Sequence, residues 1–393
     1  MRNPYNWIRC FWDVFRRELR RMTSRPIYFY CIVVAPLFCL YFFTSLMSGG
    51  LPKEMPAGVV DLDNSSNSRN IIRTLDAMDL VEVKQVYSSF YEARDAMQRG
   101  QIYGFLYIPS HFSRDLQAFR QPKLTYYTSY TMLVPGSLLY SNLRKLTELV
   151  SGAAGRSQLY ARGATEAQAM AFLQPIVIES HALDNPSLNY SIYLSNLLIP
   201  GALMLLISLI TVYAIGSEVK RNTAREWLER SNHSILLGLT AKILPYTIAF
   251  MGIGIFCDWY LYGHLLFPNH GGTALTLLLT LGMVLSAQAL GIIFFSIVPT
   301  LRMGLSMSCL WGVVSFSVCG MSFPYAAMPT PVQALSHLFP LRYYYLVYVS
   351  QTLHGNGLAY SWLGYLGLVL FILVPFVLMI RLKRELIHSF YIP

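Results

Sequence analysis

The sequence is poor in charge and lacks the motifs of nucleotide-binding and hydrolytic enzymes. Only 13% of its 393 residues are Asp, Glu, Lys or Arg, whereas an average soluble domain has about 25%. No Gly-Lys dipeptide occurs, and neither G-x-S-x-G nor H-E-x-x-H is present. These absences exclude a P-loop lysine, a nucleophile elbow and a zinc-protease helix. We therefore expect this chain to contain no catalytic residue and to bind no cofactor.

Cysteine and histidine occur without any useful pattern. One of the six cysteines, Cys10, lies near the N-terminus and the other five lie in apolar runs. This distribution does not predict a disulfide framework. The eight histidines are scattered, and none stands at metal-ligand spacing from a cysteine or a carboxylate. We expect no metal site.

The net charge of +10 is unevenly distributed along the chain. Residues 48–193 contain 13 basic and 13 acidic residues, which cancel. The excess flanks apolar runs, with +5 in residues 1–26, +2 in 217–242, +1 at Arg302 and +2 in 381–393. This is the positive-inside pattern of a membrane protein and not a nucleic-acid-binding patch, so nucleic acid is not an expected partner.

Six apolar runs are long enough to cross a bilayer as helices. Together with a hydrophobic content of 54%, they predict an α-helical membrane protein with both termini in the cytoplasm. The first run lacks a small-residue cleavage site, so we expect it to remain as an anchor. The predicted spans are 27–47, 194–216, 243–262, 273–298, 303–323 and 359–380, and residues 381–393 are predicted to form a cytoplasmic tail.

The segment before the first span, residues 1–26, is predicted to form an amphipathic helix. Aromatic side chains fall on one side and arginines on the other, which is typical of a helix lying in the inner leaflet. The alternative is a soluble basic helix or a targeting segment, which would leave the aromatic stripe exposed. The two sides are Trp7, Phe11 and Phe15 against Arg16, Arg17, Arg20 and Arg21.

Residues 48–193 alternate between strand-like and helix-like segments, which predicts a mixed α/β domain. Long helices are expected over 134–180. Asp61 and Asp63 follow the first strand and suit either a metal or catalytic pair, or Asx turns and helix caps. We favour turns and caps, because no third ligand or base follows at useful spacing. The expected strands are 57–62, 81–87, 102–109 and 124–130.

Two polar residues within the predicted spans are candidates for function. Asp258 lies in the third span, where a carboxylate suggests a proton relay or a substrate contact. Its neighbours Trp259 and Tyr260 favour the alternative that it reaches the outer headgroups. Gln288 in the fourth span is expected to bond between helices or to face a substrate path.

The segment 324–358 is interrupted by prolines into pieces too short to span a membrane. Backbone of this kind is tolerated at membrane depth when protein covers it or when it lines a cavity, so we predict a re-entrant hairpin and an outer loop. Arg342 and Tyr343 within it are candidates for contact with a lipid or a substrate headgroup. A surface anchor is the alternative for Arg342.

The loop 217–242 lies between the second and third spans. Ala224, Trp227 and Leu228 form an apolar stripe, and the excess of Lys and Arg is consistent with a cytoplasmic location. An ordinary solvated loop is the alternative. The pattern favours a short amphipathic helix at the membrane surface.

This loop resembles the first cytoplasmic loop of ABC type-2 exporter permeases. The shared features are an acidic residue, a basic pair, Thr, a short apolar helix, Leu-Leu, Lys and an apolar residue before Pro. The family usually has Gly before the Thr, where this chain has Asn222, a residue that tolerates a left-handed backbone. The matching residues are Glu218, Lys220, Arg221, Thr223, Trp227, Leu228, Leu236, Leu237, Lys242, Leu244 and Pro245.

The resemblance extends over nearly the whole chain and implies a role. Residues 1–26 are similar to the elbow helix of the family, 48–193 to its extracytoplasmic domain and 324–358 to its re-entrant hairpin. It implies an exporter permease in the bacterial inner membrane, paired with a second permease copy or a homologous permease. A separate ATPase subunit would bind ATP and Mg and dock on Glu218, Arg221, Thr223, Arg225, Trp227 and Leu228.

Further implications of the resemblance concern partners and cargo. A periplasmic membrane-fusion adaptor and an outer-membrane channel are plausible partners, and a drug, a lipid or a peptide would suit the path. Two other interpretations remain open. One is a scaffold or sensor whose 48–193 domain binds an envelope partner, and the other is a lipid-modifying enzyme that uses Asp258 or Asp61 and Asp63.

Overall fold

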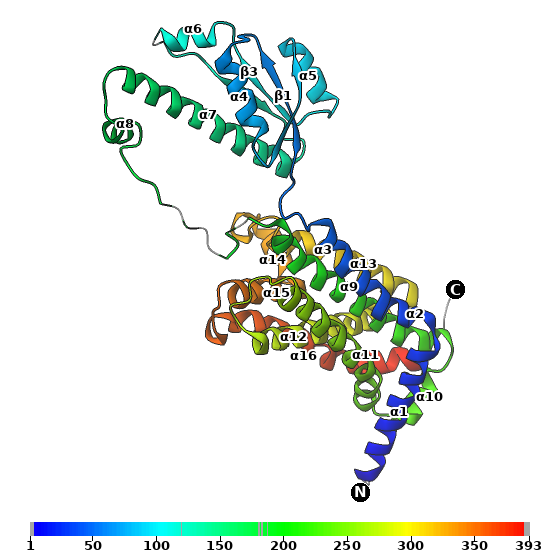
Figure 1. Cartoon of the computed structure of the whole chain (residues 1–393). Helices are drawn as coiled ribbons and strands as arrows, with labels where there is room; N and C mark the ends of the chain where they lie inside the picture. The colour runs from blue at the N-terminus through cyan, green and yellow to red at the C-terminus, as the bar shows by residue number, and fades with distance from the viewer. Residues whose placement is uncertain (1–3, 119, 180, 182–183, 187, 389–393) are drawn as a thin grey trace. The chain divides into compact units, whose positions relative to one another are not determined.

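The computed structural model describes residues 4–118, 120–179, 181, 184–186 and 188–388, and it separates into two compact units. One unit, Gly49–Ala182, is called the insert domain below. The other joins Met1–Ser48 to Leu183–Pro393 and is called the membrane unit. The described chain is mostly helical, with a small mixed sheet in the insert domain (Figure 1).

The insert domain is built on a four-stranded sheet of order β2-β1-β3-β4. Strand β1 pairs in parallel with β2 and β3, whereas β4 is antiparallel to β3. Alternate residues of β1 face opposite sides, so Val59 enters one apolar cluster and Val60 the other. A strand that is buried on both faces has a nearly continuous run of apolar residues in its sequence, as β1 does. The strands are β1 (Met55–Asp61), β2 (Val81–Tyr87), β3 (Gly104–Ile108) and β4 (Thr125–Thr128).

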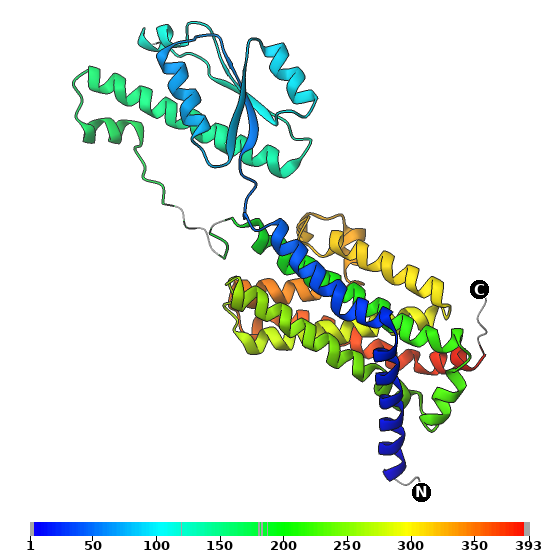
Figure 2. The ribbon, with the colours of Figure 1, turned by 45° about the vertical axis from the view of Figure 1, so that its right-hand side comes forward.

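Helices cover both faces of this sheet (Figure 2). Leu75 of α4 and Leu143 of α7 pack on one face, and Ala93 of α5 packs on the other. The sheet contains all four predicted strands, so that prediction is confirmed. The prediction of helix throughout 134–180 is wrong beyond Leu173, because Pro175 and the β-branched run that follows disfavour helix. The helices are α4 (Ser66–Asp76), α5 (Phe90–Gln98), α6 (Phe112–Gln117), α7 (Leu133–Ala161) and α8 (Glu166–Leu173).

Within its described residues, the membrane unit contains six helical stretches that are long and apolar enough to cross a membrane. The first is continuous through α2 (Pro26–Phe29), η1 (Tyr30–Val34) and α3 (Ala35–Leu46), and the third joins α11 (Ile235–Asp258) to η2 (Trp259–His264). The others are α9 (Tyr190–Lys220), α12 (Thr273–Ile297), α13 (Leu301–Val318) and α16 (Leu358–His388).

Three of these helices extend well beyond the predicted spans, and one of them, α11, begins at Ile235 and not at residue 243. Helix α9 continues to Lys220, so Glu218 belongs to its last turn and not to a loop. Helix α16 continues to His388, so much of the predicted tail 381–393 is helical, and residues 389–393 lie outside the described part.

Shorter elements complete the membrane unit. Helix α1 (Pro4–Ser24) is separated from α2 by the extended backbone of Arg25, and its axis departs from that of α3 (Figure 2). Helix α10 (Ala224–Arg230) connects α9 to α11. The predicted hairpin region contains η3 (Tyr325–Ala327), α14 (Thr330–Ser336), α15 (Pro340–Tyr348) and η4 (Val349–Leu353). That it re-enters the membrane stays a prediction.

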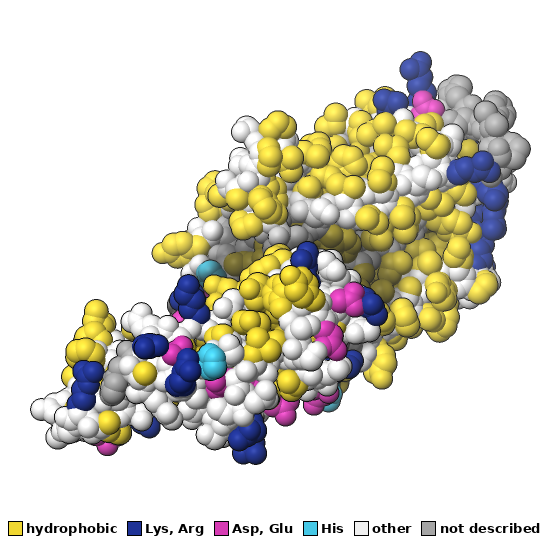
Figure 3. All heavy atoms as spheres, turned by 90° about the horizontal axis from the view of Figure 1, so that it is seen from above, with side chains coloured by type: hydrophobic (Ala, Val, Ile, Leu, Met, Phe, Trp, Pro, Cys, Tyr) yellow, Lys and Arg dark blue, Asp and Glu magenta, His cyan; other side chains and the backbone are white. Residues whose placement is uncertain are grey.

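Small residues bring the membrane helices close together. A Cβ on Gly291 of α12 would lie 2.8 Å from the Ser208 carbonyl oxygen of α9. The Ser208 hydroxyl also lies 2.5 Å from that of Ser308 on α13. In Figure 3 hydrophobic side chains cover most of the visible face of the membrane unit, whereas that of the insert domain mixes charged, polar and apolar groups. An apolar outer surface suits contact with lipid.

Candidate functional site

The last turn of α9 places a buried carboxylate at the centre of several cations. Glu218 has no exposed surface and accepts hydrogen bonds from Arg17 Nη1 at 2.8 Å and Nη2 at 3.0 Å. It also accepts from Arg21, from the Thr223 hydroxyl and from Lys242 Nζ, the last at 2.8 Å. Residues of α1, α9 and α11 therefore meet at one carboxylate.

A second carboxylate completes the arrangement. Lys242 Nζ donates to Glu18 Oε2 at 2.7 Å, and the Tyr246 hydroxyl donates to Glu18 Oε1 at 2.7 Å. Lys242 has no exposed surface and Glu18 is 1% exposed. Buried charges are tolerated when they are paired and hydrogen-bonded. We name Arg17, Glu18, Arg21, Glu218 and Lys242 the ion cluster.

The charge of the ion cluster is nearly balanced. Three cations face two carboxylates, which leaves one positive charge in excess. Burial opposes the charged form of Arg17, but its hydrogen bonds and attraction to Glu218 outweigh burial and raise its pKa. The arginines are partly exposed, so the excess charge can face water.

Helix α10 is fixed to the ion cluster by Trp227. This side chain is completely buried, and its Nε1 donates to the Gly238 carbonyl oxygen at 3.2 Å. Lys242 Nζ lies 5.1 Å from the centre of the Trp227 ring, within cation–π range. Ala224 and Leu228 pack with Trp227 against apolar residues of α1, α9, α11, α12 and α16. The apolar stripe of α10 thus faces the interior of this chain.

The opposite face of α10 is exposed and charged. Arg225 and Glu229 are exposed, as is Arg221 in the turn before the helix, whereas Thr223 is half-buried. The residues predicted to dock the ATPase therefore fall into two groups. Glu218, Trp227 and Leu228 are buried, whereas Arg221 and Arg225 are exposed. Asn222 has a φ of 54°, so the left-handed turn expected where the related permeases have Gly is confirmed.

Sequence reasoning missed much of the ion cluster. The i, i+4 spacing of Arg17 and Arg21 on one face of α1 was a signal for a shared anionic partner. Lys242, which follows an apolar run, was another, since a buried lysine requires a carboxylate. Neither signal identifies Glu218 as that partner, because the pairing joins residues 201 positions apart.

Comparison with known proteins places the chain in a family. Residues 27–381 match the family described as "ABC-2 family transporter protein". The chain belongs to the ABC-2 transporter family. No curated protein matches the sequence. Family membership and the six apolar helices make this ABC-2 protein a multi-pass membrane protein with a role in transport.

Two other predicted site residues of this ABC-2 protein, Asp258 of α11 and Gln288 of α12, lie where these two helices pack together. Asp258 is half-buried and accepts a hydrogen bond from the Thr280 hydroxyl at 2.6 Å. Gln288 is 2% exposed, and its Oε1 accepts from the Thr247 hydroxyl at 2.9 Å. The expected bond between helices at Gln288 is confirmed. Its role and that of Asp258 in a substrate path remain predictions.

Gln288 borders an apolar groove of about 250 Å³ in the ABC-2 membrane unit. Its lining comes from α11, α12 and α16 and is apolar except for Thr240, Thr247 and Gln288. Within the described part of the chain, Gln288 Nε2 has no acceptor. The mostly apolar lining of the groove suits an apolar molecule.

Arg342 and Tyr343 lie at the start of α15. Arg342 is 4% exposed, and its guanidinium carbon lies 3.8 Å from the centre of the Tyr325 ring. The Tyr343 hydroxyl lies 3.0 Å from His337 Nδ1. Because Arg342 is buried, the alternative of a surface anchor is wrong.

The acidic pair of the ABC-2 insert domain is engaged in local structure. Asp61 Oδ1 accepts from the backbone of Asp63 and Asn64, and its Oδ2 accepts from the Ser68 hydroxyl at 2.7 Å. Ser65 forms a capping box with Ser68 at the start of α4. The preferred interpretation of turns and caps is confirmed. Among the described residues, no cluster of three metal-ligating side chains occurs.

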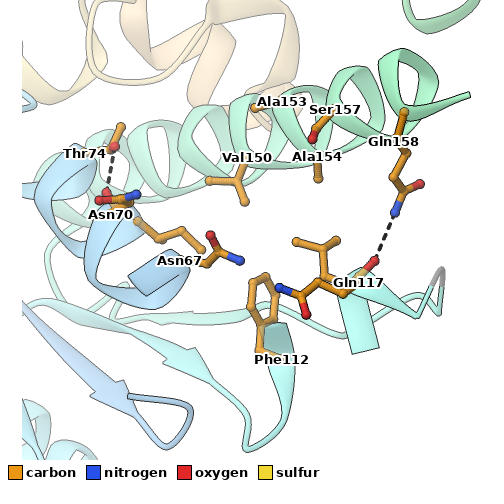
Figure 4. Close-up of a pocket in the computed structure, with 13 residues that line it drawn as sticks. Asn67, Asn70, Thr74, Phe112, Gln117, Val150, Ala153, Ala154, Ser157 and Gln158 are labelled. Atoms are coloured by element: carbon orange, nitrogen blue, oxygen red, sulfur yellow. Dashed lines mark hydrogen bonds between the residues drawn. The ribbon is translucent and has the colours of Figure 1, made fainter. Parts of the chain in front are cut away.

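The insert domain also contains a groove of about 600 Å³ between α4, α6 and α7. Figure 4 shows Val150 of α7 and Phe112 of α6 on opposite sides of the groove, with the carboxamides of Asn67 and Gln117 near them. Gln158 Nε2 donates across one end to the Leu116 carbonyl oxygen at 3.2 Å. Its lining has no charged side chain, so it suits a neutral hydrogen-bonding group.

Proposed function

We propose that this chain is the permease subunit of an ATP-driven exporter that moves a hydrophobic or amphipathic substrate out of the cytoplasm or inner leaflet. A separate ABC ATPase subunit would bind ATP and Mg and hydrolyse the nucleotide. The observation that carries this proposal is the position of α10. Its inner face is fixed to the ion cluster through Trp227, its outer face exposes Arg225 and Glu229, and Arg221 is exposed in the turn before it.

This arrangement supports a mechanical coupling route. An ATPase that moves against the exposed face of α10 displaces a short helix whose buried face is packed in the membrane unit. Glu218 passes that displacement to α9, Lys242 to α11, and Arg17 to α1. Charged pairs held at 2.7–3.0 Å resist separation, so the three helices move together.

The exposed residues of the predicted set would contact the ATPase, and the buried residues would position α10. In this proposal Arg221 and Arg225 touch the partner. Glu218, Trp227 and Leu228 act from within the chain, and Thr223 closes the turn by donating to Glu218. This assignment refines the one made from sequence.

The substrate class is supported by the groove beside Gln288. Its largely apolar walls suit a drug, a lipid or an apolar peptide better than an ion or a sugar. The positive charge beside the spans supports cytoplasmic termini and an inner-membrane location. A second permease copy, a membrane-fusion adaptor and an outer-membrane channel remain proposed partners.

Affinity purification of the tagged full chain in mild detergent tests the proposal. A stoichiometric partner with a nucleotide-binding motif is expected. Arg225→Glu should weaken its binding roughly tenfold, because charge reversal at an interface introduces repulsion. The matched control is Arg94→Glu, which reverses an equally exposed arginine in the insert domain.

Two outcomes would overturn the proposal. One is purification of the chain without an ATPase in several detergents, which would favour a scaffold or sensor. Alternatively, Arg225→Glu and Arg94→Glu would both leave the partner yield unchanged, and α10 would then not be the contact.

A further inference from the structure

Arg342 combines burial with the lack of a hydrogen-bond partner. It is 4% exposed, and two of its three guanidinium nitrogens, Nε and Nη1, find no acceptor among the described residues. Its close neighbour is the Tyr325 ring, which the guanidinium faces at 3.8 Å. A cation–π contact stabilises the charge but satisfies no N–H donor in the guanidinium plane.

The surrounding sequence provides no carboxylate for this cation. No Asp or Glu occurs between Asp258 and Glu385, a stretch that includes α12 to α15 and most of α16. Asp258 is hydrogen-bonded to Thr280, and no ion pair joins Arg342 to an acidic residue of the described chain. Removing a cation from water without an anion is strongly unfavourable, so an external anion is the expected partner.

Three further polar side chains form a chain of contacts that begins at Tyr325, the ring beneath Arg342. The Tyr325 hydroxyl lies 3.3 Å from His337 Nε2, and His337 Nδ1 lies 3.0 Å from the Tyr343 hydroxyl. They come from η3, from the residue after α14 and from α15. Tyr325 and Tyr343 are half-buried and His337 is exposed, so a ligand can approach from this side.

We propose that Arg342, Tyr325, His337 and Tyr343 form a binding site for a phosphate oxyanion. A guanidinium is the side chain best suited to phosphate, and phenol hydroxyls donate to the same oxygens. The phosphate belongs either to a phospholipid headgroup or to free inorganic phosphate. This inference goes beyond the proposed function and holds whether or not an ATPase binds α10.

The test uses the full chain purified in neutral detergent, with three probes. Phosphatidylglycerol supplies a lipid phosphate, diacylglycerol supplies the same tails without phosphate, and inorganic phosphate supplies the anion alone. Binding is measured by native mass spectrometry and by the shift in melting temperature. The wild type should bind phosphatidylglycerol and not diacylglycerol. If inorganic phosphate alone produces the shift, the source is free phosphate, and the site is still supported.

The variants separate a binding role from a structural one. Arg342→Met should weaken phosphatidylglycerol binding roughly tenfold or more, because a hydrogen-bonded charge pair is lost. Arg342→Lys should weaken it less, since the charge remains. Arg302→Met removes an exposed arginine of the same unit and should match the wild type. Without ligand, Arg342→Met should melt no lower than the wild type, because no paired charge is broken.

Several results would overturn the inference. One is equal phosphatidylglycerol binding by Arg342→Met and the wild type. Another is equal binding of diacylglycerol, which would assign the affinity to the lipid tails. Should Arg342→Met fold poorly, Tyr325→Phe keeps the ring beneath the guanidinium and removes only the hydroxyl. Unchanged phosphate affinity in that variant would exclude the tyrosine from the site.

Discussion

At the scale of single residues, Glu218 forms ion pairs with three cations, Arg17, Arg21 and Lys242. Glu218→Gln would leave Arg17, Arg21 and Lys242 without a shared anion in a buried position. Breaking a buried pair by removing one partner costs about 3–5 kcal/mol. We expect a clear fall in the melting temperature in detergent, measured by scanning fluorimetry.

The matched control for Glu218→Gln is Glu229→Gln on the exposed face of α10. A surface substitution of this kind changes stability by about 0.5 kcal/mol or less. Equal melting temperatures for the two variants would mean that the ion cluster does not stabilise the fold.

Asp63 predicts a pH dependence for the insert domain. Burial alone would raise its pKa, but hydrogen bonds from Ser65 and Ser113 outweigh burial and lower it. The folded pKa is below the unfolded value of about 3.9. The stabilisation is therefore complete above that value and is lost as the pH falls through the folded pKa.

This dependence can be measured by urea unfolding of residues 49–182 between pH 7 and pH 2. The wild type should be more stable than Asp63→Asn at pH 7, and the two should converge in acid. Asp79→Asn, which changes an exposed carboxylate, serves as the control. A constant difference across the pH range would contradict the prediction.

Local residue roles were largely predictable from sequence, and distant pairings were not. Asn222 and the Asp61 turn follow from backbone preferences that act over a few residues. The pairing of Arg17 with Glu218 depends on how α1 packs against α9, which no local pattern contains. The apolar stripe that contains Trp227 can face either a partner protein or the interior of this chain. Sequence predicted a partner contact, whereas the structure buries Trp227 within the chain.

At the scale of elements, the contact between α9 and α12 depends on a missing side chain. Gly291→Ala would place a Cβ 2.8 Å from both the Ser208 carbonyl oxygen and Thr211 Cβ. Because backbone is one of the neighbours, the helices must separate, and overpacking of this kind costs about 1–3 kcal/mol. The expected result is a lower melting temperature in detergent.

Gly252→Ala in α11 provides a close comparison, since its Cβ would meet no atom within 4 Å. Alanine is also the better helix former, so this variant should be neutral or slightly stabilising. If Gly291→Ala behaves in the same way, the two helices are not in close contact.

Element types followed well from the sequence pattern, but their ends did not. The strands were visible as short apolar or alternating runs, and the spans as long apolar ones. Helix α9 extends past its apolar run because Glu218 is neutralised by cations from other helices. An average of hydropathy along the sequence places the end of a span at the first charged residue, because it does not take into account a distant residue that neutralises this charge.

At the scale of the whole molecule, the insert domain is a compact unit. It has its own apolar clusters on both faces of the sheet, and the residues of both clusters lie within Gly49–Ala182. We expect residues 49–182 expressed alone to be soluble and to unfold in one cooperative transition, measured by circular dichroism. As a control, Leu75→Ala, which truncates a completely buried side chain, should lower its stability by about 2–5 kcal/mol. Non-cooperative melting would show that the domain depends on the rest of the chain.

The family was predictable because its signals are spread over the whole chain. Six apolar runs, a basic loop and an inserted α/β domain each reduce the number of membrane-protein families that the sequence fits. The family match over residues 27–381 covers nearly all of these features. The site at Arg342 was only outlined by sequence. Its burial and the contacts of Tyr325 and His337 depend on how three short elements, η3, α14 and α15, pack together, and composition alone does not predict this packing.

The ion cluster has a consequence for synthesis of the chain. Glu18 and Lys242 are 224 positions apart, so α1 leaves the ribosome long before its partner exists. At about 5–20 residues per second, the delay is roughly 10–45 s. Until Glu218 and Lys242 have been made, Arg17, Arg21 and Glu18 lack the long-range partners that they have in the folded chain. Closure of the ion cluster is therefore a late step of biogenesis, and a nascent chain stopped before residue 242 cannot complete it.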